Sequence, residues 1–327
     1  MLGYVARRLA QMIVVLLGIS VLVFALLHLV PGDPAAILLG QQATAQDIVR
    51  LRHVMGLDRP LWDQFVRYVT RAARGDLGTS IFLGGQPVTA LIATRLPATA
   101  ELALTAMACA VAIGVPVGVV SAVRQYSVID IVGMAVTQVG ISMPVFWLGM
   151  LLILVFSLEL RWLPTFGRGA PLTAAFAALL AGRGAPLLDS ARHLAMPAMT
   201  LALSAVVLIT RMVRSAMLEV LGQDYVRTAR SKGLSARAVT YRHALRNAVL
   251  PVLTIVGLQA GALLGGAVVT ETIFGWPGVG QLLINAIGQR DFPIIQGTAL
   301  VTALVFSGIN LAVDIAYAWL DPRIRYG

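Results

Sequence analysis

The chain has 327 residues, of which 58% are hydrophobic and 12% are charged. In soluble domains about a quarter of the residues are charged, so this composition excludes a soluble globular protein. It indicates an integral membrane protein. The formal charge of +10 would suit a nucleic-acid-binding protein, but the basic residues lie between apolar runs and are not interleaved with aromatic residues. Such charges are typical of the loops of a membrane protein, and we expect no nucleic-acid partner.

Six apolar runs are each long enough to cross a hydrocarbon core of about 30 Å as an α-helix. They cover residues 9–30, 97–122, 128–156, 195–213, 251–270 and 294–320. The sequence therefore predicts an all-α integral membrane protein with about six transmembrane helices.

The N-terminal run begins like a signal peptide, with Arg7 and Arg8 before apolar residues. It is too long for a cleaved signal core and lacks a small-residue cleavage site, so residues 1–30 are predicted to remain as the first transmembrane helix. Arginines in the short loops favour a cytoplasmic N-terminus. Six spans then return the C-terminus, with Arg323 and Arg325, to the same side.

Residues 31–96 follow as a long extracytoplasmic segment. Apolar residues recur there at helical spacing around Leu57, Leu61, Phe65 and Tyr68, which predicts one short helix. Residues 97–327 are then a five-helix core. Its outer loop, residues 159–194, has glycine and proline throughout and is predicted to be irregular.

Prolines and glycines also mark the interior of the spans. Kinks are expected at Pro116 and at Pro144. Gly257, Gly261 and Gly265 lie four residues apart on one face of the fifth span. Small residues at this spacing let helices approach closely. We favour packing within the chain for these glycines, and a subunit interface or the translocation pathway is the alternative.

Two carboxylates lie inside predicted spans, where ionisable groups usually face the bundle interior or water. Glu101 is about one turn from the outer end of the second span, and we expect it to reach the surface. Asp314 is deeper. If the fourth and sixth spans are adjacent, Arg211 or Arg214 could pair with it, and we favour this structural pairing over contact with a substrate.

The most basic loop, residues 214–248, joins the fourth and fifth spans and is predicted to be cytoplasmic. Asp224 suits a helix N-cap and Gly233 suits the left-handed position after a helix, which predicts a helix over 225–232. Ser235 is expected to cap a second helix running toward Asn247, and Pro251 to lie in the first turn of the fifth span.

On the predicted short helix, Arg227 and Arg230 share one face, and Tyr225 and Ala229 share another. The alternative explanation of the arginines is that they only orient the protein and attract anionic lipid. That explanation does not require paired helix signals around a segment of about eight residues.

The stretch ETIFGWPGVGQLL follows the fifth span on the predicted outer side. Phe274, Trp276 and Pro277 are our candidates for an outer gate, in a short re-entrant hairpin buried in protein or lining a cavity. Interfacial anchoring of Trp276 is the alternative.

No catalytic or metal-binding pattern was found in the sequence. A phosphate-binding loop needs Lys followed by Ser or Thr, but Gly233 follows the only lysine, Lys232. The histidines are never four residues apart and no serine lies in a GxSxG motif. We therefore expect no enzyme activity, no cofactor and no metal site in this chain, and any ATP hydrolysis would have to come from a partner.

Several motifs occur in order along nearly the whole chain: HLVPGDP, GLDRPL, GDLGTSI, RLPATAELAL, MLEVLGQDYVRTARSKGLS, ETIFGWPGVGQLL and DPRIRYG. They resemble the B-type permease subunit of the dipeptide/oligopeptide/nickel class of ATP-binding-cassette (ABC) importers. The resemblance implies a type I importer fold in the bacterial inner membrane. It also implies that the short helix is a coupling helix held by a separate ATPase.

The coupling residues implied by the resemblance are Asp224, Tyr225, Arg227, Thr228, Ala229, Arg230, Lys232 and Gly233. The general importer signature has Glu-Ala-Ala, three residues, then Gly. Arg227, Thr228 and Ala229 replace its first three residues, and this version is similar to the peptide subgroup. The departure removes the glutamate that would contact the ATPase.

The resemblance further implies a second homologous permease, two ATPase subunits or one fused ATPase, and an extracytoplasmic substrate-binding protein. Short peptides are the favoured substrate, and nickel chelates or glutathione are alternatives. The rival class is a secondary transporter or channel that works without ATP, but an ion relay and paired internal repeats with interrupted spans are not evident in the sequence.

Overall fold

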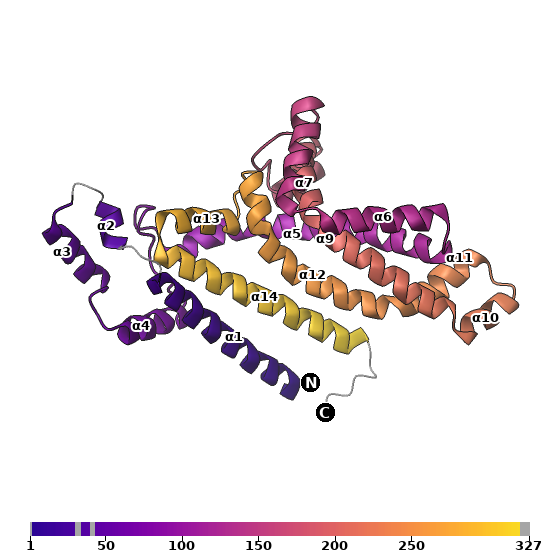
Figure 1. Cartoon of the computed structure of the whole chain (residues 1–327), viewed down its shortest axis with the longest axis horizontal. Coiled ribbons are helices and arrows are strands. Elements are labelled where there is room, and N and C mark those ends of the chain that lie inside the picture. Colours follow the sequence, from indigo (N-terminus) through magenta and orange to yellow (C-terminus); the bar gives the residue numbers. More distant parts are fainter. Residues whose placement is uncertain (1, 30–33, 40–42, 321–327) are drawn as a thin grey trace. The chain divides into compact units, whose positions relative to one another are not determined.

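A computed structural model describes residues 2–29, 34–39 and 43–320, and the regular secondary structure of these residues is helical (Figure 1). Arg323, Arg325, the DPRIRYG motif and most of the PGDP motif lie outside the described residues. The helices are α1 (Leu2–Leu29), α2 (Pro34–Leu39), α3 (Ala45–Met55), α4 (Leu61–Ala73), α5 (Val88–Val123), α6 (Val128–Ser142), α7 (Val145–Leu152), α8 (Leu172–Leu180), α9 (Ala185–Leu221), α10 (Asp224–Ser231), α11 (Ala236–Ala238), α12 (Arg246–Ile273), α13 (Val279–Gln289) and α14 (Phe292–Leu320), with π-helical segments η1 (Ile153–Glu159) and η2 (Val239–Leu245).

Four helices are long and apolar enough to cross a membrane: α1, α5, α9 and α14. Two bent pairs give up to six spans. One pair joins Val128–Ser142 to Val145–Glu159 at an angle of 106°, and the other joins Ala236–Val249 to Pro251–Gly265 at 56°. The prediction of about six apolar spans is therefore confirmed as four unbroken helices and two bent pairs.

The prolines have unequal effects on these helices. Pro144 has extended backbone angles between α6 and α7, so the chain breaks there more sharply than the predicted kink. α5 continues through Pro116 as one helix. Pro251 lies inside α12 and not in the first turn of a span, which corrects the prediction, and it lies at the 56° bend. Proline lacks a backbone donor, and this weakens a helix wherever packing does not compensate.

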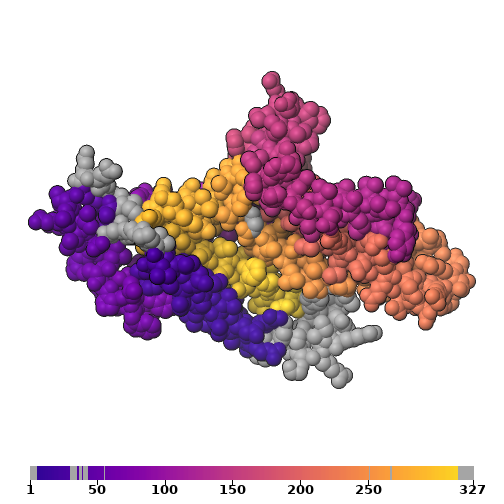
Figure 2. Space-filling view, in the orientation of Figure 1, coloured from indigo at the N-terminus to yellow at the C-terminus, as the bar shows by residue number. Residues whose placement is uncertain are grey.

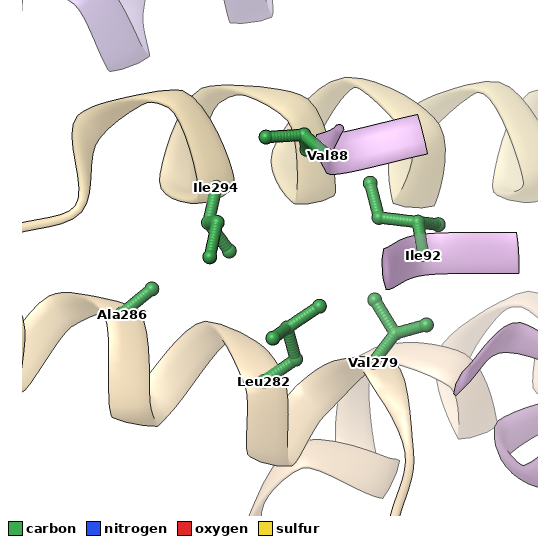
Figure 3. Packing of buried hydrophobic residues seen from close by; sticks show 6 residues of the cluster. All are labelled: Val88, Ile92, Val279, Leu282, Ala286 and Ile294. Carbon is green, nitrogen blue, oxygen red and sulfur yellow. The ribbon is translucent and has the colours of Figure 1, made fainter. Parts of the chain in front are cut away.

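The chain forms two compact units. Unit 1 comprises Met1–Pro97 and Pro277–Gly308, and unit 2 comprises Ala98–Trp276 and Ile309–Gly327. In unit 1, α13 packs against the first turns of α5 and α14 (Figure 3). The buried side chains of this core are Val88, Ile92, Val279, Leu282, Ala286 and Ile294.

Residues 31–96, where one short helix was predicted, contain three whole helices, α2, α3 and α4, and the start of α5. α3 begins at a capping box formed by Thr44 and Asp47 and ends at Gly56, which is left-handed at φ 69°. Leu57 therefore lies in the turn, and α4 carries Leu61, Phe65 and Tyr68. The prediction of one helix was wrong in part because Gly56 adopts a positive φ and ends α3.

Unit 2 is built around α9, which packs against α12, α8, α6 and α7. The segment formed by α7, η1 and α8 projects from α6, as Figure 2 shows in magenta. The prediction of an irregular loop over 159–194 was wrong for about half of that stretch. The run Leu172–Leu180 is rich in alanine and leucine and forms α8, while Pro171 and Gly184 lie at helix boundaries.

Glycines allow three helices of unit 2 to approach closely. A Cβ atom on Gly118 would lie 2.7 Å from the Thr210 carbonyl oxygen, and one on Gly114 would lie 2.9 Å from Ile209. A Cβ atom on Gly140 would meet Val207 at 3.2 Å. These contacts hold α5 and α6 against α9, as small residues do at helix crossings in membranes.

Candidate functional site: the basic hairpin

The basic loop folds as a helical hairpin, residues 224–245, which we call the basic hairpin. Its first arm, α10, begins at Asp224, and the N-cap is Gln223. Asp224 is therefore the first helical residue and not the predicted cap, a position where its carboxylate is still favourable beside the helix N-terminus. Gly233 is left-handed at φ 79° just past the helix, as predicted.

The second arm returns through α11 and η2 into α12. The Ser235 hydroxyl accepts a hydrogen bond from the Ala238 amide at 3.3 Å, so Ser235 caps this arm as predicted. The helix continues past Asn247 without ending there. The Asn247 side-chain amide donates to the Tyr225 hydroxyl at 2.8 Å, which ties the end of the second arm to the start of α10.

The two arms share a small apolar core. Val226, Ala229 and Val239 are buried together, and Val220 and Leu221 from the end of α9 pack against them. Ala229 is 7% exposed, so it faces the chain itself. Tyr225 is 42% exposed, and it and Ala229 therefore do not form one shared surface.

The opposite face of α10 is exposed and basic. Asp224, Arg227, Thr228, Arg230, Lys232 and Gly233 are all exposed. The contact between Arg227 and Asp224 is 3.8 Å long and lies on the surface, where an ion pair adds little stability. Seven of the eight sequence-predicted coupling residues therefore remain accessible for contact with a partner, and Ala229 does not.

An ion pair that the sequence did not predict holds the helix leading into α10. Arg214 binds Asp130 with two contacts of 2.7 Å, and Arg211 donates to the Gln138 side chain at 2.5 Å. Arg214 thus pairs with Asp130 of α6, and the pairing of Asp314 with Arg211 or Arg214 stays a prediction. An acidic residue near the start of an apolar run, as at Asp130, was the available signal.

The predicted outer-gate stretch is a buried turn before α13. Phe274 and Trp276 are each 1% exposed. The Trp276 indole donates to the Ala98 carbonyl at 2.8 Å, and the Gly167 amide donates to the Phe274 carbonyl at 2.9 Å. Interfacial anchoring of Trp276 is therefore wrong. Pro277 follows in the link to α13.

Glu101 does not reach the surface either. It pairs with Arg168 and accepts a hydrogen bond from the Leu172 amide at 3.2 Å. The Arg168 guanidinium also lies over the Trp276 ring, 5.8 Å from its centre. Sequence reasoning missed Arg168 as the partner because it lies 67 residues away in a loop. It also missed Glu271, which is fully buried and accepts from the Thr99 hydroxyl at 2.6 Å.

The predicted glycine stripe on α12 has unequal surroundings. A Cβ atom on Gly257 would lie 2.3 Å from Val313 of α14, whereas one on Gly265 would meet nothing within 4 Å. Gly261 is buried. Gly257 therefore serves close packing within this chain, and Gly265 does not.

Unit 1 contains a cavity of about 630 Å³ at α4, lined in part by His28, Gln64, Tyr68 and Arg71. Burial raises the pKa of Tyr68 to about 12. The hydrogen bond from Arg71 lowers the pKa of Asp76. His28 is bound to the Phe24 carbonyl at 2.8 Å and to Gln64 at 3.3 Å. Within the described residues, no group of three or more His, Cys, Asp or Glu side chains could hold a metal ion.

The helical architecture is that of a multi-pass membrane protein, and comparison with known proteins places the chain in a family. Residues 114–326 match the binding-protein-dependent transport system inner membrane component, and residues 1–103 match the N-terminal part of such membrane components. The chain belongs to this family and is a bacterial inner-membrane permease subunit of an ABC importer.

Curated relatives match over the whole chain. The dipeptide transport system permease protein DppB of Alkalihalophilus pseudofirmus is 45% identical, with 100% of both chains covered. DppB of Escherichia coli K12 is 42% identical, covering 100% of this chain and 99% of the relative. The glutathione transport system permease protein GsiC of Salmonella typhi is 44% identical, again with both chains covered fully.

A solved structure shares the fold. The inward-facing MetNI methionine ABC transporter matches 71% of this chain and 96% of its own chain, with a TM-score of 0.55 and 18% identity. At this identity the match supports the type I importer fold alone. Family membership implies that the chain works with an ATPase and a substrate-binding protein.

Proposed function

We propose that this chain forms half of the translocation pathway of an ATP-driven importer for short peptides. The full-length similarity to permeases for dipeptides and for glutathione carries this proposal. Glutathione is itself a tripeptide, so short peptides are the substrate class common to these relatives. Nickel chelates remain the alternative within the same importer class.

The proposed assembly contains a second, homologous permease, two ATPase subunits or one fused ATPase, and an extracytoplasmic binding protein. ATP and Mg²⁺ bind to the ATPases and not to this chain. Both termini and the basic hairpin lie on the cytoplasmic side, where the ATPases bind. The binding protein delivers the peptide on the outer side, and Phe274, Trp276 and Pro277 help close the pathway there.

The exposed face of α10 is the proposed contact with the ATPase. Arg227 and Arg230 project from it and would pair with carboxylates of the ATPase groove. Arginine suits such a contact because its planar guanidinium binds carboxylates with two parallel hydrogen bonds. The buried core formed by Val226, Ala229 and Val239 would make the basic hairpin move as one piece.

Transport by purified components tests the proposed function. The complete importer is reconstituted into lipid vesicles, and uptake of a labelled dipeptide is measured with and without ATP and binding protein. We expect uptake only when both are present, and competition by unlabelled tripeptide but not by a nickel chelate. Uptake without ATP would favour a secondary transporter or channel, and competition by the chelate alone would overturn the peptide assignment.

Charge reversal on α10 tests the coupling contact. We expect Arg230→Glu to reduce ATP-driven uptake by at least about tenfold, because a close interfacial charge pair contributes several kcal/mol. Arg242→Glu is the matched control, since it makes the same charge change at an exposed position on η2. Equal loss in both variants, or full transport by Arg230→Glu, would remove Arg230 from the proposed contact.

A further inference from the structure

A buried ion pair joins the inner parts of α6 and α9. Arg214 donates through Nε to Asp130 Oδ1 and through a terminal nitrogen to Asp130 Oδ2, each at 2.7 Å. The Asp130 side chain is 4% exposed and that of Arg214 is 22% exposed. Both charges are largely withdrawn from water, so the loss of one would leave the other buried without its partner.

The carboxylate end of this pair is fixed to the turn between α5 and α6. The Tyr126 amide donates to Asp130 Oδ2 at 3.0 Å, and the Ser127 hydroxyl accepts from the Asp130 amide at 3.3 Å. Asp130 also lies in the first turn of α6, where a carboxylate is favourable. Arg214 therefore holds α9 to a rigid corner of the chain.

The guanidinium end of the pair lies close to the basic hairpin. Arg214 is seven residues, or about two helical turns, before the end of α9 at Leu221. Only Gly222 and Gln223 separate α9 from α10. Leu221 also packs into the hairpin core, so a displacement of α10 would carry the inner end of α9 with it.

The other contacts between α6 and α9 are less directional. Gly140 lets α6 approach the Val207 side chain, and such apolar packing resists separation more than sliding. One turn outward from Arg214, Arg211 donates to the neutral Gln138 side chain, and this contact is exposed. Of the contacts described here between α6 and α9, the bidentate Asp130–Arg214 pair is the one that joins two opposite charges in a fixed geometry.

We infer that the Asp130–Arg214 pair is a positioning contact that transmits the movement of α10 to α6 during each ATP-driven cycle. α6 ends at Ser142, before the break at Pro144, so the contact positions the part of unit 2 that α6 and α9 form. The inference rests on the proposed function, since it assigns a role in coupling. Neither residue touches the transported peptide in this account.

Four variants distinguish a role of the Asp130–Arg214 pair in positioning α6 from a role in stability alone. Asp130→Asn keeps an acceptor for the Tyr126 amide, and Arg214→Met keeps the long apolar stem. The double variant D130N/R214M leaves no buried unpaired charge and so is expected to assemble. Arg214→Lys keeps the positive charge but loses the two-pronged geometry. Arg211→Met is the control one turn along α9.

The measured quantities are the melting temperature of the assembled importer, its ATP hydrolysis, and the peptide imported per ATP hydrolysed. Each single charge-removing variant should melt earlier than the double variant. The double variant should hydrolyse ATP but import about tenfold less peptide per ATP, a typical size for coupling between sites. Arg214→Lys should also import less per ATP than the native importer, and Arg211→Met should match it.

Recovery of the native import per ATP in D130N/R214M would show that the pair is only structural. The inference would also be overturned if Arg214→Lys imported as much peptide per ATP as the native importer. An equal loss of import per ATP in Arg211→Met would overturn it as well. Failure of the proposed function is distinguishable, because the native importer itself would then show no ATP-dependent peptide uptake.

Discussion

Gly257 and Gly265 are two turns apart on α12 and differ in what a side chain would meet. We expect Gly257→Ala to lower the free energy of unfolding by about 1 to 3 kcal/mol, because its methyl group would overlap Val313. Gly265→Ala should be neutral or stabilising by up to about 1 kcal/mol, since alanine favours helix and the space is open. Thermal unfolding of the purified chain in detergent measures both. Equal melting temperatures would contradict the packing described for α12.

Trp276 provides a second test at the residue scale. Trp276→Phe removes the donor to the buried Ala98 carbonyl and leaves a gap where the larger ring was, and we expect a loss of about 1 to 3 kcal/mol. Trp162→Phe is the matched control, because that tryptophan is 64% exposed. The change in midpoint is read by thermal unfolding. If the control loses as much stability as Trp276→Phe, the indole hydrogen bond does not contribute as described.

Individual charged residues were the part of the candidate site least predictable from sequence. Glu101 was expected at the surface, yet it pairs with Arg168, and Arg214 pairs with Asp130. Sequence marks such residues as costly inside a membrane, but their partners come from segments that only the tertiary structure brings together. Gly233 and Ser235 were predictable because helix termination and capping depend on neighbours in the chain.

The basic hairpin makes its own prediction at the scale of elements. Val226→Asp would place a charge in the core between α10 and η2, and a buried unpaired charge is costly enough to separate the arms. We expect the ATPase to co-purify poorly with this variant although every arginine is retained. Tyr241→Asp is the control, because that side chain is exposed on η2.

Retention of the ATPase by Val226→Asp would show that α10 does not need the hairpin core to bind. Accelerated proteolysis within residues 224–245 of the variant provides an independent check that the arms have separated.

Helices were more predictable than their interruptions. Long apolar runs predicted the four unbroken helices and the two bent pairs, because a helix satisfies its own backbone groups in lipid. The consequences of proline were not predictable from the residue alone: Pro144 separates two helices, whereas α5 continues through Pro116. Packing against α9 holds α5 together around Pro116, since Gly114 and Gly118 both make close approaches there.

At the scale of the whole molecule, the sequence motifs alone indicate the permease family. They could not show that residues 277–308 pack with the N-terminal unit, because contacts so distant in sequence leave no local pattern. They also could not show that the helix predicted to bind an ATPase hides one of its eight predicted contact residues, Ala229, against the chain itself.

The central claim is that the exposed face of α10 binds the ATPase, and cross-linking tests it most directly. Thr228→Cys is made in a chain whose single cysteine, Cys109, is replaced by serine, and Arg183→Cys in the same background is the control in the predicted outer loop. We expect a thiol-reactive cross-linker to join residue 228 to the ATPase in the assembled importer, and residue 183 not to react with it. An adduct at residue 183 but not at residue 228 would contradict both the coupling surface and the predicted orientation.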